Sequence, residues 1–154
     1  METSLQLADR FREVLLNGTW IANTNFKHQL MSLSFDDAYK TVGSHNSILT
    51  LTIHINYYIE GILGFFDSGR LEIHDRYSFD CQHIKTMEDW ENLMERLFEN
   101  AEAFAEYVST LSDAQLDAVF VDPKYGTYRR NIEGVIEHSY YHLGQISLIK
   151  KLLH

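Results

Sequence analysis

Two histidines near the carboxyl end of the chain, His138 and His142, stand four positions apart. If this segment is helical, both imidazole rings project from one face, with Cβ atoms about 5–6 Å apart, and both can bind one metal ion. The spacing alone is weak support, because a chain with eight histidines has a chance of roughly one in three of containing such a pair. Taken alone, the pair is better explained as two polar residues at a helix edge.

The position of the histidines relative to the apolar stripes strengthens the metal interpretation. At about 100° per residue, His138 and His142 fall on the flank of the apolar stripe of their helix, and His54 falls on the same flank of an earlier helix. These rows also carry Gln145 and Ile149 on the later helix, and Tyr58, Gly61 and Phe65 on the earlier one. Desolvated neutral imidazoles are good metal ligands, and unpaired imidazoles at a core boundary would cost free energy. A tight helix contact without metal remains the alternative.

Four long segments with helical periodicity must position these residues. The sequence predicts an all-α protein, a four-helix bundle with a long connection between the second and third helices. The expected long helices cover residues 4–16, 44–67, 86–108 and 127–153, with short helical stretches at 25–33 and 112–116. Residues 68–85 show no sustained periodicity and are expected to form the long connection. No repeat or low-complexity stretch indicates a second domain, so residues 1–154 are predicted to form one domain.

Several helix ends can be predicted from capping residues. Thr86 and Asp89 resemble a capping box at the start of the third long helix, and Thr127 is expected to cap the last one. Either Ser44 or Asn46 is a candidate cap for the second long helix.

Composition narrows the functional classes. The net charge of −9 and the lack of clustered basic residues disfavour nucleic acid as a partner. The amino-terminal segment has no apolar region typical of a signal peptide, and no apolar run approaches membrane-spanning length. Cys81 is the only cysteine, so neither an intrachain disulfide nor a cysteine metal cluster can form. These features predict a cytoplasmic protein that does not associate with membranes.

The stretch from Glu137 to Ile146, EHSYYHLGQI, resembles the HxxxHxGQI signature of the DinB-like (damage-inducible) superfamily. The segment 46–58 resembles that family's second helix, which carries its first histidine. The order of helices and the long connection also fit, so the resemblance covers nearly the whole chain. It implies a four-helix bundle whose three metal ligands are His54, His138 and His142. Leu143 departs from the pattern, because many members have arginine there, so charge-dependent substrate contacts cannot be carried over.

Three histidines on a divalent ion leave coordination positions for water or substrate, which favours catalysis or substrate binding over a purely structural role. Imidazole ligands suit Zn, Ni, Fe or Cu, and Zn or Ni is expected. The resemblance implies a metal-dependent enzyme that acts on a small molecule, either a hydrolase or a thiol transferase that uses a low-molecular-weight thiol.

Tyr58, one turn after His54, is the nearest candidate for an assisting catalytic group. The alternatives are a non-catalytic metal-binding or stress-response protein, and a packed bundle without metal.

Other catalytic motifs are absent from the sequence. There is no HExxH or HxxEH motif, no glycine-rich phosphate loop and no GxSxG elbow. Glu137 is expected to point about 100° away from its neighbouring ligand.

Four histidines outside the proposed ligand set are expected to be solvated, because they lie in turns, short segments or at the terminus. They are His28, His45, His74 and His154. The resemblance also implies a homodimer, although no sequence feature locates its interface.

Overall fold

The computed structural model describes residues 1–154, and all its regular elements are helices, apart from an isolated β-bridge between Val119 and Thr127. The prediction of an all-α protein is confirmed. The long elements are α1 (Ser4–Arg12), which continues into the π-helical turn η1 (Glu13–Asn17), α4 (Ile48–Ser68), α5 (Met87–Ser109) and α7 (Tyr128–Leu153). The short ones are α2 (Phe26–Leu30), α3 (Phe35–Tyr39), η2 (Asp75–Tyr77), α6 (Asp113–Leu116) and η3 (Pro123–Tyr125).

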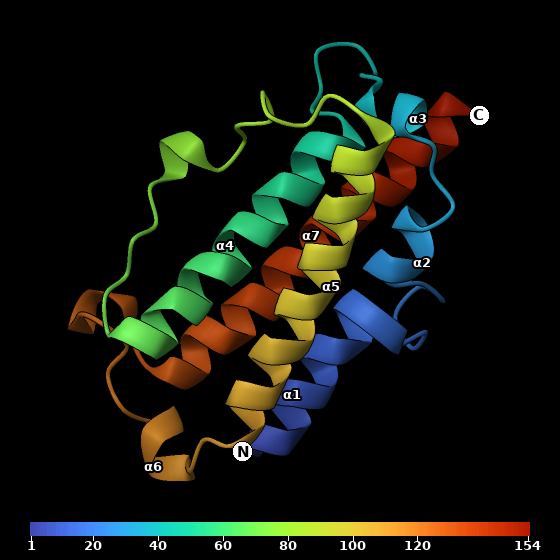
Figure 1. Cartoon of the computed structure of the whole chain (residues 1–154). Coiled ribbons are helices and arrows are strands. Elements are labelled where there is room, and N and C mark those ends of the chain that lie inside the picture. Colours follow the sequence, from blue (N-terminus) through green and yellow to red (C-terminus); the bar gives the residue numbers. More distant parts are fainter.

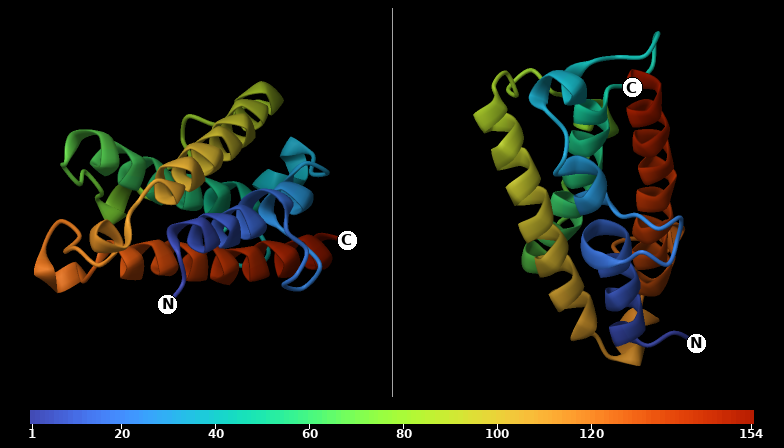
Figure 2. Two further views of the ribbon diagram at one scale, coloured as in Figure 1. Left: turned by 90° about the horizontal axis from the view of Figure 1, so that it is seen from below. Right: turned by 90° about the vertical axis from the view of Figure 1, so that its right-hand side faces the viewer.

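The long segments pack side by side around a common core (Figure 1). α1 contacts α5, α5 contacts α4, α4 contacts α7, and α7 contacts α1. The two further views in Figure 2 show α4 and α5 on one side of the molecule and α1 and α7 on the other. A single cluster of 33 buried hydrophobic residues lies between them, because each helix turns its apolar stripe inward. Its largest fully buried side chains include Trp90, Phe11, Phe26 and Phe104.

Capping side chains define where the helices of the site begin. Thr127 caps α7, and its hydroxyl accepts a hydrogen bond from the Arg130 amide at 3.1 Å. The prediction for α4 is wrong, since neither Ser44 nor Asn46 caps it. Ser47 does so instead, because its backbone is extended and its hydroxyl reaches the Thr50 amide at 3.2 Å. The helix therefore begins at Ile48, four residues later than expected.

The third long helix starts as predicted. The Thr86 hydroxyl accepts from the Asp89 amide at 3.1 Å, and the Asp89 carboxylate accepts from the Thr86 amide at 3.0 Å. This reciprocal pair is a complete capping box in which aspartate replaces the usual glutamate or glutamine. The connection between α4 and α5 therefore ends at Thr86, the residue before the helix begins.

The connection between α4 and α5 runs along the outside of α4 (Figure 1). It leaves α4 at Gly69, which adopts the left-handed conformation with φ 72°. The Tyr57 hydroxyl accepts from the His74 amide at 2.8 Å and donates to the His74 carbonyl at 3.1 Å. A Cβ at Gly61 would lie 2.4 Å from Cγ1 of Ile73, so the Ile73 side chain packs against α4 in the space that a Cβ would occupy. These contacts hold residues 73–79 against the helix that carries His54.

One helix is apolar enough to raise the question of a membrane span. α4 passes that test by length and composition, with a mean hydropathy of 1.2 over an 18-residue window. However, 61% of this window is buried inside the protein, as in the core helix of a soluble protein. The apolar character of α4 therefore follows from its place between α5 and α7.

Candidate metal centre

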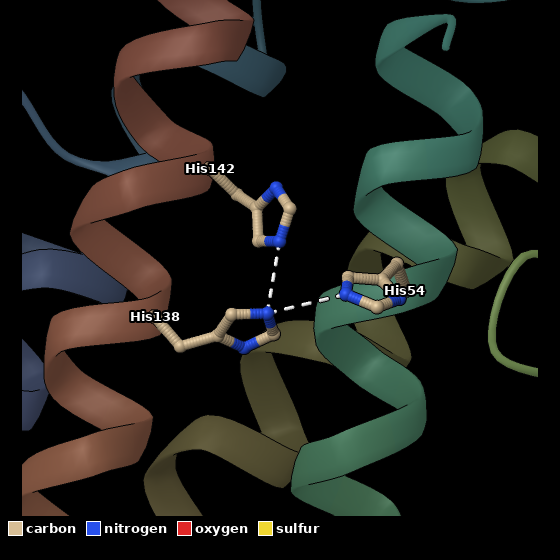
Figure 3. Close-up of side chains that lie close together, drawn as sticks. All are labelled: His54, His138 and His142. Atoms are coloured by element: carbon tan, nitrogen blue, oxygen red, sulfur yellow. Dashed lines mark hydrogen bonds between the residues drawn. The ribbon is translucent and has the colours of Figure 1, made fainter. Parts of the chain in front are cut away.

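The three predicted ligands meet between α4 and α7. His138 and His142 project from consecutive turns of α7, and His54 faces them from α4 (Figure 3). Nε2 of His138 lies 3.2 Å from Nε2 of His54 and 2.9 Å from Nε2 of His142. All three rings offer a ligand nitrogen within 4.8 Å of the others. His54 and His142 are buried, with 7% and 6% exposure, whereas His138 is half-buried.

Hydrogen bonding fixes the proton on one of these rings. Nδ1 of His142 lies 2.7 Å from Oε1 of Gln145, one turn further along α7. Because an amide oxygen can only accept, Nδ1 must carry the ring proton of the neutral imidazole. Nε2 of His142 therefore presents its lone pair toward His138 and His54. This is the orientation that a partner on the second ring nitrogen gives to metal-binding histidines.

The connection between α4 and α5 encloses His54. The Phe79 ring stacks on the imidazole, with centroids 4.0 Å apart and planes 6° from parallel. Nδ1 of His54 is buried and has no hydrogen-bond partner of ordinary geometry, although the backbone of Ser78 lies close enough to favour its protonation. An unpaired buried ring nitrogen costs free energy in the folded protein.

Burial keeps the histidines neutral. Loss of solvation, followed by the charges of the neighbouring His142 and His138, lowers the pKa of His54 to about 4. Burial and then the charge of His142 lower the pKa of His138 to about 4 as well. The pKa of His142 is also lowered by burial, against the opposing effect of its bond to Gln145. At neutral pH the cluster therefore holds three uncharged rings, the form that binds metal.

The nitrogen positions are compatible with a bound metal ion. A ring nitrogen offers either one hydrogen or one lone pair in the ring plane, so Nε2 of His138 can make a good hydrogen bond to only one neighbour. Ligand nitrogens about 2.0–2.1 Å from zinc lie about 3.3–3.4 Å apart in a tetrahedral site. Two of the three separations, 3.2 and 2.9 Å, are close to that value, and all three ligand nitrogens lie within 4.8 Å of one another. The donor set therefore suits a divalent ion of the kind that imidazole prefers.

Comparison with known proteins agrees with this geometry. A family model described as the DinB superfamily matches residues 22–146, a range that includes all three histidines. The chain belongs to the DinB superfamily. The resemblance inferred from the HxxxHxGQI signature is therefore confirmed. No curated protein and no solved structure matches the chain.

Tyr58, the predicted assisting residue of this DinB protein, lies beside the cluster. Its ring makes edge contacts with His54 and His138, at centroid distances of 5.0 and 5.4 Å. Its hydroxyl donates to Oδ1 of Asp75 at 2.5 Å. Burial and then the Asp75 carboxylate raise the pKa of Tyr58 to about 12. The hydroxyl thus keeps its proton at neutral pH and cannot serve as a base there.

The residues that sequence reasoning missed come from the long connection. Asp75, Ser78 and Phe79 belong to a segment without periodicity, so no pattern could assign them to the site. Gly61 was expected to leave space beside the ligand row, and the connection uses that space through Ile73.

The residues set aside as solvated are exposed in the structure. Five histidines lie outside the cluster and all are exposed, including the four predicted to be solvated: His28, His45, His74 and His154. Glu137 is exposed as well and forms an ion pair with Arg130 at 3.1 Å, so it points away from the ligand nitrogens as expected. Leu143, which replaces the arginine of many family members, is buried in the core.

Proposed function

We propose that this DinB protein is a metal-dependent enzyme that acts on a small molecule, with His54, His138 and His142 as ligands of a divalent ion. The convergence of three neutral ring nitrogens from two helices carries the proposal. No cysteine or carboxylate joins the three histidines. Structural zinc sites normally have four protein ligands, so a three-histidine set leaves room for water or substrate.

The proposed ion is zinc or nickel, and the proposed reaction is thiol transfer or hydrolysis. A divalent ion bound there supplies Lewis acidity, which lowers the pKa of a coordinated thiol or water. The resemblance favours thiol transfer with a low-molecular-weight thiol as co-substrate.

The chain's own residues prepare the site. Gln145 holds the Nδ1 proton of His142 and so directs the Nε2 lone pair inward. Phe79 covers His54 and excludes water from that side. Tyr58 keeps a proton at its hydroxyl, tied to Asp75, and is proposed to assist as a hydrogen-bonding group near His138.

The proposal extends to the organisation and assembly of the whole molecule. We infer that the four long segments constitute a four-helix bundle in one domain, working in the cytoplasm on a small-molecule substrate. A homodimer is supported by an apolar row on the outer face of α7, whose side chains are more than half exposed. The members of this row are Tyr141, Leu148 and Leu152.

The first experiment measures bound metal in protein purified without a histidine tag. We expect about one ion per chain after incubation with zinc or nickel, and loss of that ion in the variant His138→Ala/His142→Ala. The His45→Ala variant is the matched control, because this histidine is exposed and outside the cluster. If the wild type binds no metal above background, the protein is a packed bundle without metal and the enzymatic proposal is wrong.

The second experiment tests catalysis with the metal that binds. Metal-loaded protein is assayed for thiol transfer and for hydrolysis across a broad substrate panel, beside His54→Ala. Turnover that depends on His54 supports an enzyme. One ion per chain without turnover would support the alternative, a non-catalytic metal-binding protein in which the ion joins α4 to α7.

A further inference from the structure

A cleft opens directly beside His138. It has a volume of about 500 Å³, within the size range of small-molecule sites. Its walls come from α4, α7, the connection between α4 and α5, and the loop before α7. Most of the lining is apolar, with Ile62, Ile73, Phe120 and Val135 among the side chains that form it. A molecule that reaches the metal centre from this side therefore needs an apolar body.

One row of α7 forms the floor of the cleft. Arg130, Gly134 and His138 follow one another at intervals of four residues, so they lie on the same helix face. A Cβ built at Gly134 would have no heavy atom within 4 Å, which means that the middle of this row is open space. Along this row a cationic residue is followed by an open position and then by a proposed metal ligand, and their Cα atoms span about 12 Å of helix.

Arg130 is the only lysine or arginine that lines the cleft. Its guanidinium pairs with Glu137, two turns further along α7, at 3.1 Å. Both side chains of this pair are more than half exposed, so the pair contributes little to stability and another carboxylate can replace Glu137. A guanidinium binds carboxylates in a planar, two-bond arrangement. An adjoining hollow carries Asp75 and Arg76.

The loop at one end of the cleft is strained. Val121 has φ 56°, a conformation that β-branched residues rarely adopt. The neighbouring Phe120 is buried against Tyr128 and Phe65, and its amide donates to the Gly126 carbonyl at 2.9 Å. Such strain persists where surrounding contacts enforce it, and it is concentrated at binding sites. The apolar end of the cleft is therefore preformed.

We propose that this cleft binds small carboxylates with an apolar body, with the carboxylate on Arg130 and the other end directed at His138. The inference names the substrate class of the metal centre and in that sense rests on the proposed function. It follows from the cation, the open glycine row and the apolar walls together.

The test is an NMR titration of the zinc-loaded protein with two probes of the same shape, 4-phenylbutyrate and its neutral analogue 4-phenylbutanamide. We expect both to shift the amide signals of α7 around Gly134, with the carboxylate binding about tenfold more tightly. Arg130→Gln should abolish this preference without changing the affinity for the amide. Glu137→Gln should tighten binding of the carboxylate, because a competing carboxylate is removed.

Two control pairs separate the cleft from general effects. Gly134→Leu should block both probes, whereas Gly64→Leu, at an exposed helical glycine with equally open surroundings, should block neither. Lys124→Gln removes a cation outside the cleft and should leave the preference intact. Circular dichroism and metal content check that each variant folds.

The titration is repeated after chelation, because a carboxylate can also bind a metal ion directly. A preference that requires zinc and survives in Arg130→Gln would overturn the inference, as would equal affinity for the two probes or binding of neither. Failure of the protein to bind zinc would contradict the proposed function instead. The titration stays interpretable in that case, since the probes need no metal to occupy the cleft.

Discussion

At the scale of single residues, the bond between His142 and Gln145 should determine how tightly the site binds metal. Gln145→Leu removes the acceptor that holds the Nδ1 proton, so the ring loses its fixed tautomer and orientation. We expect metal affinity to fall by about 10–100-fold, as for other second partners of metal-binding histidines. Competition with a chromophoric chelator measures this change.

The matched variant is Gln145→Glu, whose carboxylate also accepts the Nδ1 hydrogen bond. It should bind metal at least as tightly as the wild type. Wild-type affinity in Gln145→Leu would show that the bond plays no part in binding.

The lowered pKa values of the cluster predict a pH dependence for the metal-free protein. In the unfolded chain these rings titrate near 6.5, whereas the pKa of His54 and of His138 is about 4 in the folded state. Between these values the unfolded state binds more protons, so the free energy of unfolding falls as the pH drops from 6.5 toward 4. Melting temperatures measured with chelator present, over this range, should show that decline.

Removing one ring should weaken this pH dependence. His138→Ala deletes one neutral histidine and the charge that it would place near His54, so its melting temperature should vary less over the same range. Replacement of the exposed His45 should leave the wild-type slope unchanged. An equal slope in His138→Ala would mean that groups other than His138 dominate the titration over this range.

At the scale of elements, the docking of the long connection onto α4 depends on Gly61. A Cβ there would come within 2.4 Å of the Ile73 side chain, so Gly61→Ala must displace this side chain, which packs the connection carrying Ser78 and Phe79 onto α4. We expect a loss of about 1–3 kcal/mol in the free energy of unfolding, together with weaker metal binding. Urea unfolding and metal titration measure the two effects.

Gly64→Ala, one turn further along α4, is the control for this change. Its Cβ would meet nothing within 4 Å, so alanine should stabilise the helix by about 0.5–1 kcal/mol. If both variants were equally stable, the connection would not be anchored at Gly61.

At the scale of the whole molecule, the histidine cluster joins two helices that are far apart in the sequence. An ion held by His54 on α4 and by the pair on α7 binds only the folded protein. At 100–1,000 times its dissociation constant it should therefore raise the melting temperature by roughly 5–15 °C. Chelator should reverse the shift, and His138→Ala/His142→Ala should show none. A melting temperature that zinc and nickel leave unchanged would indicate a bundle without metal.

The sequence by itself determined the helices, most of their caps and the identity of the clustered histidines. Periodicity and capping are local properties, because they depend on residues within a few turns of each other. His54, His138 and His142 could therefore be placed on the flanks of the apolar stripes of their helices. The start of α4 was misplaced because three neighbouring positions, Ser44, Asn46 and Ser47, all carry side chains that can cap. Only the backbone conformation at Ser47 decides among them.

Only the tertiary structure decided what surrounds the histidines. The spacing of the Nε2 atoms, the stacking of Phe79 on His54 and the bond from Tyr58 to Asp75 all depend on how α7 and the connection pack on α4. The connection has no period that a sequence could reveal, and it is held by close approach at Gly61 and by hydrogen bonds to Tyr57. Such contacts join residues distant in the chain, and their geometry exists only once the helices have packed.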